Sequence, residues 1–181
     1  YISTSTTNTI VNGNNITSVK LNMKNMREEI KNFYGDLLKG VVIEEETQED
    51  VQKSIRDYRP DRSKQWLRLQ QCNQMAKDSV EKYDFIIRSR TDLVFNCSLE
   101  IKNEMDKAVC LMKHFDSKIP IHDQFAFGTP DLMDVYCGLY NVWVPRVQGG
   151  RSEEQLYKWL ISQEIPLHFL QSLKFQMVRG V

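Results

Sequence analysis

The chain has 181 residues, of which 41% are hydrophobic, and its 24 basic residues balance its 24 acidic residues. This length suits one domain with a core of its own, and the composition excludes an intrinsically disordered chain. The zero net charge excludes nucleic-acid binding through bulk positive charge, and no apolar run reaches the roughly 18 residues of a membrane-spanning helix.

The N-terminal part of the chain begins with a polar stretch. Residues 1–4 have the pattern of a strand end, so we expect a first strand and helix to precede this sequence. Residues 3–18 are rich in Thr, Asn and Ser, which predicts a long polar loop that is either functional or plainly disordered. Apolar residues at helical spacing predict a helix over 25–38, and a Val-Val-Ile run at 41–43 predicts a short strand.

The longest helical pattern covers residues 63–82, where Trp66, Leu69, Cys72 and Val80 form an apolar stripe. This pattern leads directly into an apolar, strand-like run at 83–88. A helix followed at once by a strand is typical of an α/β domain.

The C-terminal half alternates between strand and helix patterns. Thr129 followed by Pro130 predicts a helix start, and Ser152 with Gln155 forms a capping box that opens a second helix. Apolar runs predict strands at 93–97, 108–112, 119–127, 166–170 and 173–178.

The four cysteines are widely spaced, form no CxxC pair and lie in apolar surroundings: Cys72, Cys97, Cys110 and Cys137. This pattern predicts buried free thiols of a reducing compartment rather than disulfides. We therefore expect a cytoplasmic protein.

Three charges stand between two apolar runs in the segment YDFIIRSRTDLVF at residues 83–95. Arg88, Arg90 and Asp92 are costly to bury unless they are paired or bind a ligand. Open α/β sheets place their ligands at the carboxyl ends of strands, where these charges are expected to lie. Two interpretations stay open, a structural Arg–Asp pair and a binding site.

A further carboxylate, Asp123, lies in the segment IHDQFAFGTP. Carboxylates together with arginines suit one particular chemistry. Mg²⁺ or Mn²⁺ binds through one or two carboxylates and substrate phosphates, arginines share the charge of a diphosphate leaving group, and another carboxylate takes a proton from an attacking hydroxyl. This set describes the transfer of a sugar from a nucleoside diphosphate.

Four segments, in this order, resemble nucleotide-sugar glycosyltransferases of the GT-A fold: SKQWLRLQQCNQM, YDFIIRSRTDLVF, HDQFAFGTPDLMDVY and SEEQLYKWLISQEIPL. The likeness is to the small transferases of large algal DNA viruses and of bacterial surface-polysaccharide clusters. It implies one α/β domain over residues 1–181, with a mostly parallel sheet between helices. It also implies transfer of a hexose or deoxyhexose from a nucleoside diphosphate, first of all UDP, to a hydroxyl of a glycan or glycoprotein, with Mn²⁺ or Mg²⁺ assisting.

The same resemblance implies roles for individual side chains. Asp92 matches the metal-binding aspartate of the family's DxD-type motif, in which Arg90 replaces the first aspartate. Asp123 is the candidate general base or acceptor contact, and His168 is a candidate metal or phosphate ligand. The remaining candidates bind substrate: Arg68, Arg88 and Arg90 the diphosphate, Ser3 and Thr4 the nucleobase or ribose, and Glu153 and Glu154 the acceptor.

Each candidate also has a plain structural interpretation that stays open. Asp92 would form an ion pair, and Asp123 would cap a strand end or turn. The two glutamates would only start a helix, His168 would be packed or exposed, and Arg68 would be solvated. For the whole chain, the alternatives are a sugar-nucleotide nucleotidyltransferase and a non-catalytic sugar-binding or interaction domain.

Overall fold

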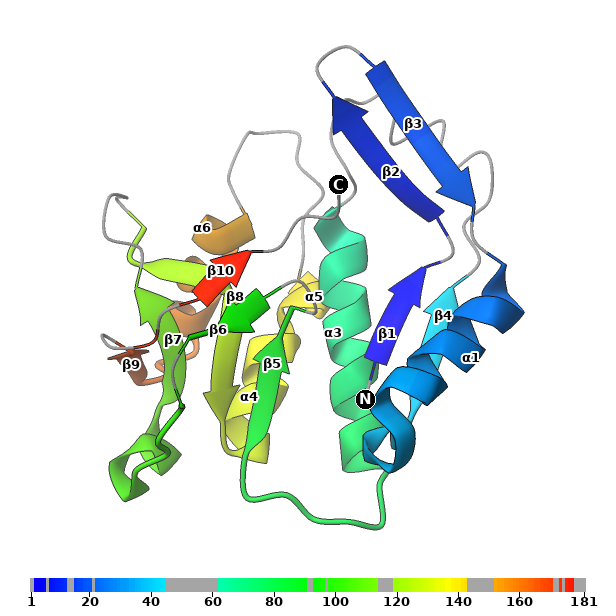
Figure 1. Ribbon diagram of the computed structural model, residues 1–181. Helices are drawn as coiled ribbons and strands as arrows, with labels where there is room; N and C mark the ends of the chain where they lie inside the picture. Colours follow the sequence, from blue (N-terminus) through cyan, green and yellow to red (C-terminus); the bar gives the residue numbers. More distant parts are fainter. Residues whose placement is uncertain are drawn as a thin grey trace. The chain divides into compact units, whose positions relative to one another are not determined.

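The computed structural model describes residues 2–5, 7–12, 15–20, 22–44, 62–90, 93–96, 98–113, 119–142, 152–170, 173 and 175–177. The chain divides into two compact units, Tyr1–Ser79 and Val80–Val181 (Figure 1). Each unit contains paired strands and helices of its own, and the single domain expected from the sequence stays a prediction. None of the helices in the described ranges is both long and apolar enough to cross a membrane.

The first unit contains a pair of parallel strands, β1 (Ile2–Ser5) and β4 (Val41–Glu44). The strand predicted at 41–43 is thereby confirmed. The long helix α3 (Arg62–Lys77) lies against β1 (Figure 1). It confirms the helix predicted over 63–82, although it ends at Lys77.

The helix α1 (Met23–Tyr34) has a cap at each end. At its start, the side chain of Asn22 accepts a hydrogen bond from the backbone N–H of Lys24 at 2.9 Å. At its end, Gly35 has a φ of 52°, a left-handed conformation that glycine adopts without steric cost. The 3-10 helix η1 (Gly35–Leu37) then leads toward β4.

A β-hairpin occupies most of the stretch for which the sequence predicted a long loop over residues 3–18. β2 (Thr7–Asn12) and β3 (Asn15–Lys20) pair in antiparallel fashion, with the last residue of β2 opposite the first of β3. The loop prediction is wrong because Thr, Val and Ile recur among the Asn and Ser residues, and β-branched residues favour strands whatever their polarity. The Gly13-Asn14 dipeptide between the strands is a hairpin signal.

A four-stranded mixed sheet forms the centre of the second unit, in the order β5-β8-β7-β9. Its strands are β5 (Ile86–Ser89), β7 (Val109–Lys113), β8 (Ile121–Gly128) and β9 (Leu167–Leu170). β5 and β7 both pair with β8 in antiparallel fashion, whereas β9 runs parallel to β7. The α/β class is confirmed, but the prediction of a mostly parallel sheet is wrong.

The connections between strands explain this outcome. Residues 114–120 alone separate β7 from β8, and a parallel crossover needs a dozen or more residues. The connection from β8 to β9 reverses the chain once more, so β9 runs parallel to β7. The described residues of this connection include three helices: α4 (Pro130–Cys137), α5 (Leu139–Val142) and α6 (Ser152–Ser162).

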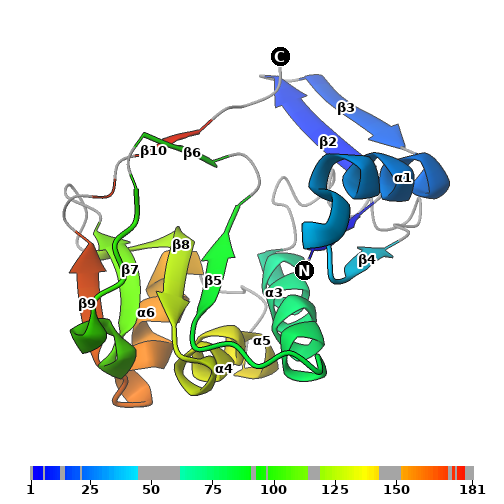
Figure 2. The ribbon, with the colours of Figure 1, turned by 60° about the horizontal axis from the view of Figure 1, so that its bottom comes forward.

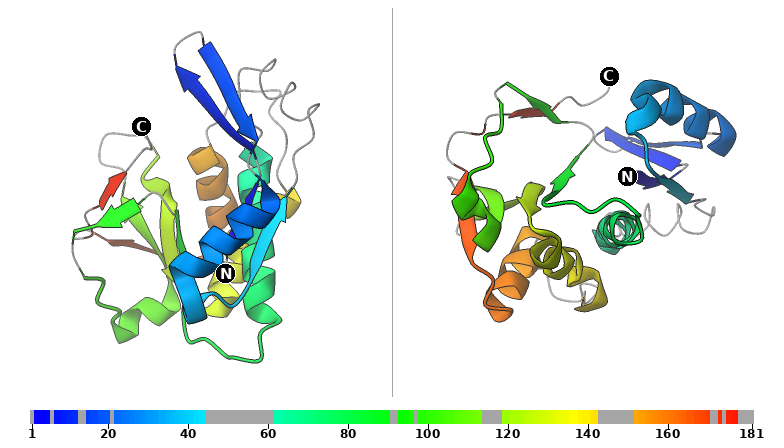
Figure 3. Two further views of the ribbon diagram at one scale, coloured as in Figure 1. Left: turned by 45° about the vertical axis from the view of Figure 1, so that its right-hand side comes forward. Right: turned by 90° about the horizontal axis from the view of Figure 1, so that it is seen from below.

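The sheet of the second unit is covered differently on its two faces (Figures 2 and 3). α4 and α6 lie on one face, here called the helix face. The other face lies toward β6 (Leu93–Phe95), which pairs in antiparallel fashion with β10 (Phe175–Met177). One hydrophobic cluster, to which the 3-10 helix η2 (Asn103–Lys107) contributes Met105, joins these elements: Leu93, Met105, Cys110, Met112, Phe125, Phe127, Leu170 and Leu173.

The described cysteines are thiols that form no disulfide, as the sequence predicts. Cys110 and Cys137 are buried and Cys72 is half-buried, while Cys97 lies outside the described residues. Burial raises the pKa of the Cys110 thiol to about 11, so this thiol stays protonated and weakly nucleophilic at neutral pH.

A hydrogen bond between helices ties α6 to α4 on the helix face. The indole Nε1 of Trp159 donates to the backbone carbonyl of Val135 at 2.7 Å. We expect Trp159→Phe to lower the free energy of unfolding by about 1–2 kcal/mol, because the ring is largely kept but the hydrogen bond is lost. Urea unfolding measures this change.

The matched control for Trp159→Phe is Lys158→Met on the same helix. Lys158 pairs with Glu154 at 2.7 Å but is exposed, so its replacement should change the unfolding free energy by less than about 0.5 kcal/mol. Equal effects of the two substitutions would mean that the Trp159 bond does not stabilise the packing of α6.

Candidate functional site

Arg88 is a buried charge in the second unit. It lies on β5 opposite Ala126 of β8, so both side chains are on the same face of the sheet. The exposed fraction of Arg88 is 7%, and its Nε and Nη1 atoms are buried without a hydrogen-bond partner among the described residues. A buried cation with donor nitrogens left unbonded is costly, and an anionic ligand would supply the missing acceptors.

The phenol of Tyr136, on α4, lies within electrostatic reach of Arg88. Tyr136 is fully buried, and this burial raises the pKa of its phenol well above the ordinary range. The charge of Arg88 lowers that pKa, and the charge of Asp123 raises it further. The phenol is therefore neutral at physiological pH and lies near one positive and one negative side chain.

Asp123 and Ser152 form a buried hydrogen bond. The hydroxyl of Ser152, the first residue of α6, donates to Oδ2 of Asp123 on β8 at 2.7 Å. The exposed fractions are 6% for Asp123 and 3% for Ser152. The capping box predicted at Ser152 gives the start of α6 correctly, but the Ser152 hydroxyl is used to bind a carboxylate of the sheet.

A break in the strand register accompanies Asp123. Leu111 pairs with Ala126, and Lys113 pairs with Ile121, so two steps along β7 correspond to five steps along β8. The extra residues lie between Ile121 and Ala126, which is where Asp123 is. Such irregularities bend a strand and redirect its side chains, and they are common next to active sites.

Arg88, Asp123, Tyr136 and Ser152 together are called the buried polar cluster. It combines a guanidinium, a carboxylate, a neutral phenol and a hydroxyl, supplied by β5, β8, α4 and α6 of the second unit. A guanidinium binds phosphate or carboxylate groups, and a buried carboxylate can accept a proton from a hydroxyl. The cluster can therefore hold an anion and assist a proton transfer.

Three further predicted residues of the second unit lie close to members of the cluster in the sequence: Glu153, Glu154 and Arg90. Glu153 and Glu154 are half-buried in the first turn of α6, directly after Ser152, and Glu154 pairs with Lys158. Arg90 is exposed, and its backbone N–H donates to the carbonyl of Gln124 at 3.3 Å.

The two predicted metal ligands are Asp92 and His168. Asp92 lies outside the described residues. His168 is half-buried on β9, opposite Cys110 of β7. The described ranges contain no group of three or more His, Cys, Asp or Glu side chains that could hold a metal ion.

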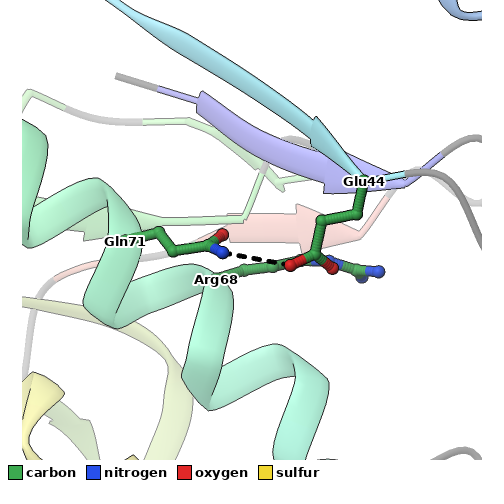
Figure 4. Close-up of polar contacts among 3 residues, drawn as sticks. All are labelled: Glu44, Arg68 and Gln71. Carbon is green, nitrogen blue, oxygen red and sulfur yellow. Dashed lines mark hydrogen bonds and ion pairs between the residues drawn. The ribbon is translucent and has the colours of Figure 1, made fainter.

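The remaining candidates belong to the first unit. Ser3 and Thr4 lie on β1, where they pair with Val42 and Ile43 of β4. Figure 4 shows Arg68 and Gln71 of α3 on either side of the Glu44 carboxylate at the end of β4. Arg68 Nε forms an ion pair with Glu44 Oε2 at 3.5 Å, and Gln71 Nε2 donates to Glu44 Oε1 at 3.0 Å. In this arrangement Arg68 joins the helix to the strand.

Two members of the buried polar cluster were missed as functional residues by the sequence analysis. Tyr136 belongs to the buried face of α4 together with Met133 and Cys137, and this spacing predicts a core residue. No local signal distinguishes it from a core tyrosine. Ser152 matched a helix-start pattern, which gave no reason to expect a bond to a carboxylate 29 residues earlier.

Comparison with known proteins adds no relative. Neither a protein-family model, nor a curated protein, nor a solved structure matches the chain. The GT-A resemblance therefore depends on the four sequence segments, and the argument for function depends on those segments and on the buried polar cluster.

Proposed function

We propose that the chain is a glycosyltransferase, which moves a sugar from a nucleoside diphosphate, first of all UDP, to a hydroxyl of a glycan acceptor. The observation that carries this proposal is the buried guanidinium of Arg88, with two nitrogens unbonded among the described residues. A diphosphate supplies the negative charge and the hydrogen-bond acceptors that this group needs. Arg88 also belongs to the segment that resembles the GT-A transferases.

The roles of the cluster follow from its chemistry. Arg88 binds the diphosphate and stabilises the charge that develops as the sugar leaves. Asp123 accepts the proton of the attacking acceptor hydroxyl. Tyr136 is neutral, so it adds no negative charge that would compete with the diphosphate for Arg88. Glu153 and Glu154, which follow Ser152 in α6, are the proposed acceptor contacts.

A divalent metal belongs to the same proposal, with Asp92 and His168 as the candidate ligands. The described side chains do not supply a metal-binding group, so no step of the mechanism above passes through a metal. In the family resemblance, Mn²⁺ or Mg²⁺ would neutralise the diphosphate. Arg90 of the second unit is a further proposed contact for the diphosphate, whereas the roles predicted for Arg68, Ser3 and Thr4, which belong to the first unit, stay predictions.

Calorimetric titration with UDP and with GDP, each with and without Mn²⁺, tests the donor site. We expect micromolar binding of one nucleotide that requires the metal and is lost in Asp92→Asn. In contrast, binding of neither nucleotide under any condition would contradict the proposed function.

One observation favours a second candidate, a non-catalytic sugar-binding or interaction domain. Asp123 is hydrogen-bonded to Ser152 within the fold, as a purely structural carboxylate would be. In that case Asp123→Asn would change stability only, and no nucleoside diphosphate would be released from any sugar donor.

A further inference from the structure

We infer that Ser152 is a positioning residue, which holds the carboxylate of Asp123 in the orientation that proton transfer requires. This inference rests on the proposed function, in which Asp123 is the general base. It assigns a role to the first residue of α6 that the sequence pattern did not indicate.

The hydrogen bond from Ser152 to Asp123 is short and buried. The Ser152 hydroxyl donates to Asp123 Oδ2 at 2.7 Å, and both side chains are more than nine-tenths buried. Hydrogen bonds to an ionised acceptor are stronger than neutral ones, and exclusion of water removes the competing donors. This bond therefore restricts the rotation of the Asp123 carboxylate.

The donor of this bond is held rigidly. α6 is anchored by Leu156 and Leu160, which are fully buried, and by the hydrogen bond from Trp159 to α4. Ser152 is thus fixed by a packed helix. A second acceptor for its hydroxyl, Oε2 of Glu153, lies farther away at 3.5 Å.

The carboxylate of Asp123 needs such a donor at this position. Asp123 lies where β8 departs from regular pairing with β7, so the β7–β8 ladder does not fix its direction. A bond from outside the sheet supplies that constraint. A catalytic group displaced by about 1 Å can lose on the order of 100-fold in rate, so the constraint affects turnover more than binding.

The test compares Ser152→Ala with Ser152→Thr, which keeps the hydroxyl, and with Ser162→Ala. Ser162 is the matched control, because its hydroxyl also donates at 2.7 Å on the same helix but is exposed. Release of nucleoside diphosphate is measured from a panel of UDP- and GDP-linked hexoses and deoxyhexoses, with water in place of the glycan hydroxyl as the acceptor of the sugar. We expect Ser152→Ala to lower kcat about 10- to 100-fold with the donor KM within about twofold, Ser152→Thr to restore most of kcat, and Ser162→Ala to change neither.

A double-mutant cycle of Ser152→Ala and Asp123→Ala, in which each substitution removes one partner of the bond, is followed by urea unfolding and measures the bond without reference to turnover. Additive shifts of the unfolding midpoint would overturn the inference. An active wild type whose kcat is unchanged in Ser152→Ala would also overturn it and leave the proposed function standing. A wild type that releases no nucleoside diphosphate from any donor would overturn the proposed function, and the role of Ser152 with it.

Discussion

Replacing Arg88 with methionine is expected to weaken nucleoside diphosphate binding by about 2–5 kcal/mol without lowering the free energy of unfolding. The binding loss follows from removing the cation that pairs with the diphosphate. The unchanged or higher stability follows because Nε and Nη1 of Arg88 are buried without partners among the described residues, so methionine relieves a desolvation cost. Titration with the nucleotide that the wild type binds, together with urea unfolding, measures both effects.

The control for this experiment is Lys107→Met, which removes an exposed cation in η2. It should leave binding and stability as they are in the wild type. A different result for Arg88→Met, in which stability falls by several kcal/mol and binding persists, would show that Arg88 is a structural residue. Such a result would favour the interaction-domain alternative.

Replacing Asp123 with asparagine is expected to lower kcat about 100- to 10,000-fold, because an amide cannot accept the proton of the acceptor hydroxyl. The fold should persist, since the amide oxygen of asparagine can still accept the hydrogen bond from Ser152. Donor binding should also persist, because Arg88 is unchanged. Steady-state release of nucleoside diphosphate gives kcat, and calorimetric titration gives the donor affinity.

Asp131→Asn provides the matched control for Asp123→Asn. Asp131 is an exposed carboxylate in the first turn of α4, and its replacement should alter kcat by less than about twofold. If Asp123→Asn retained wild-type kcat, the general base would be another group and Asp123 would have a structural role only.

The elements with a strong local pattern could be predicted from the sequence. The Pro130 helix start, the helix that begins at Ser152 and the apolar strands of the second unit all appear close to their expected positions. Apolar periodicity decides these elements because it determines which side chains can be buried together. The hairpin of β2 and β3 was missed because its strands are polar and carry no such pattern.

Strand direction could have been predicted better than it was. The short connection at 114–120 permits only an antiparallel pair, but the family resemblance favoured a parallel sheet. The site was predictable only in part. Arg88 and Asp123 were recognised by charge in an apolar context, whereas the contributions of Tyr136 and Ser152 depend on tertiary packing that local patterns do not encode.

The position of β9 in the sheet has a consequence for the order of folding. β7 and β8 join residues close in the chain, such as Leu111 and Ala126, whereas β9 pairs Leu167 with Val109. Pairing residues that are far apart in the chain costs more loop-closure entropy, so such pairs form later. Ser152 lies on the connection that must close before β9 can pair, and its bond to Asp123 spans 29 residues. A nascent chain that has emerged only as far as β8 therefore carries Arg88 and Asp123 without Tyr136 and Ser152, and so without the complete cluster.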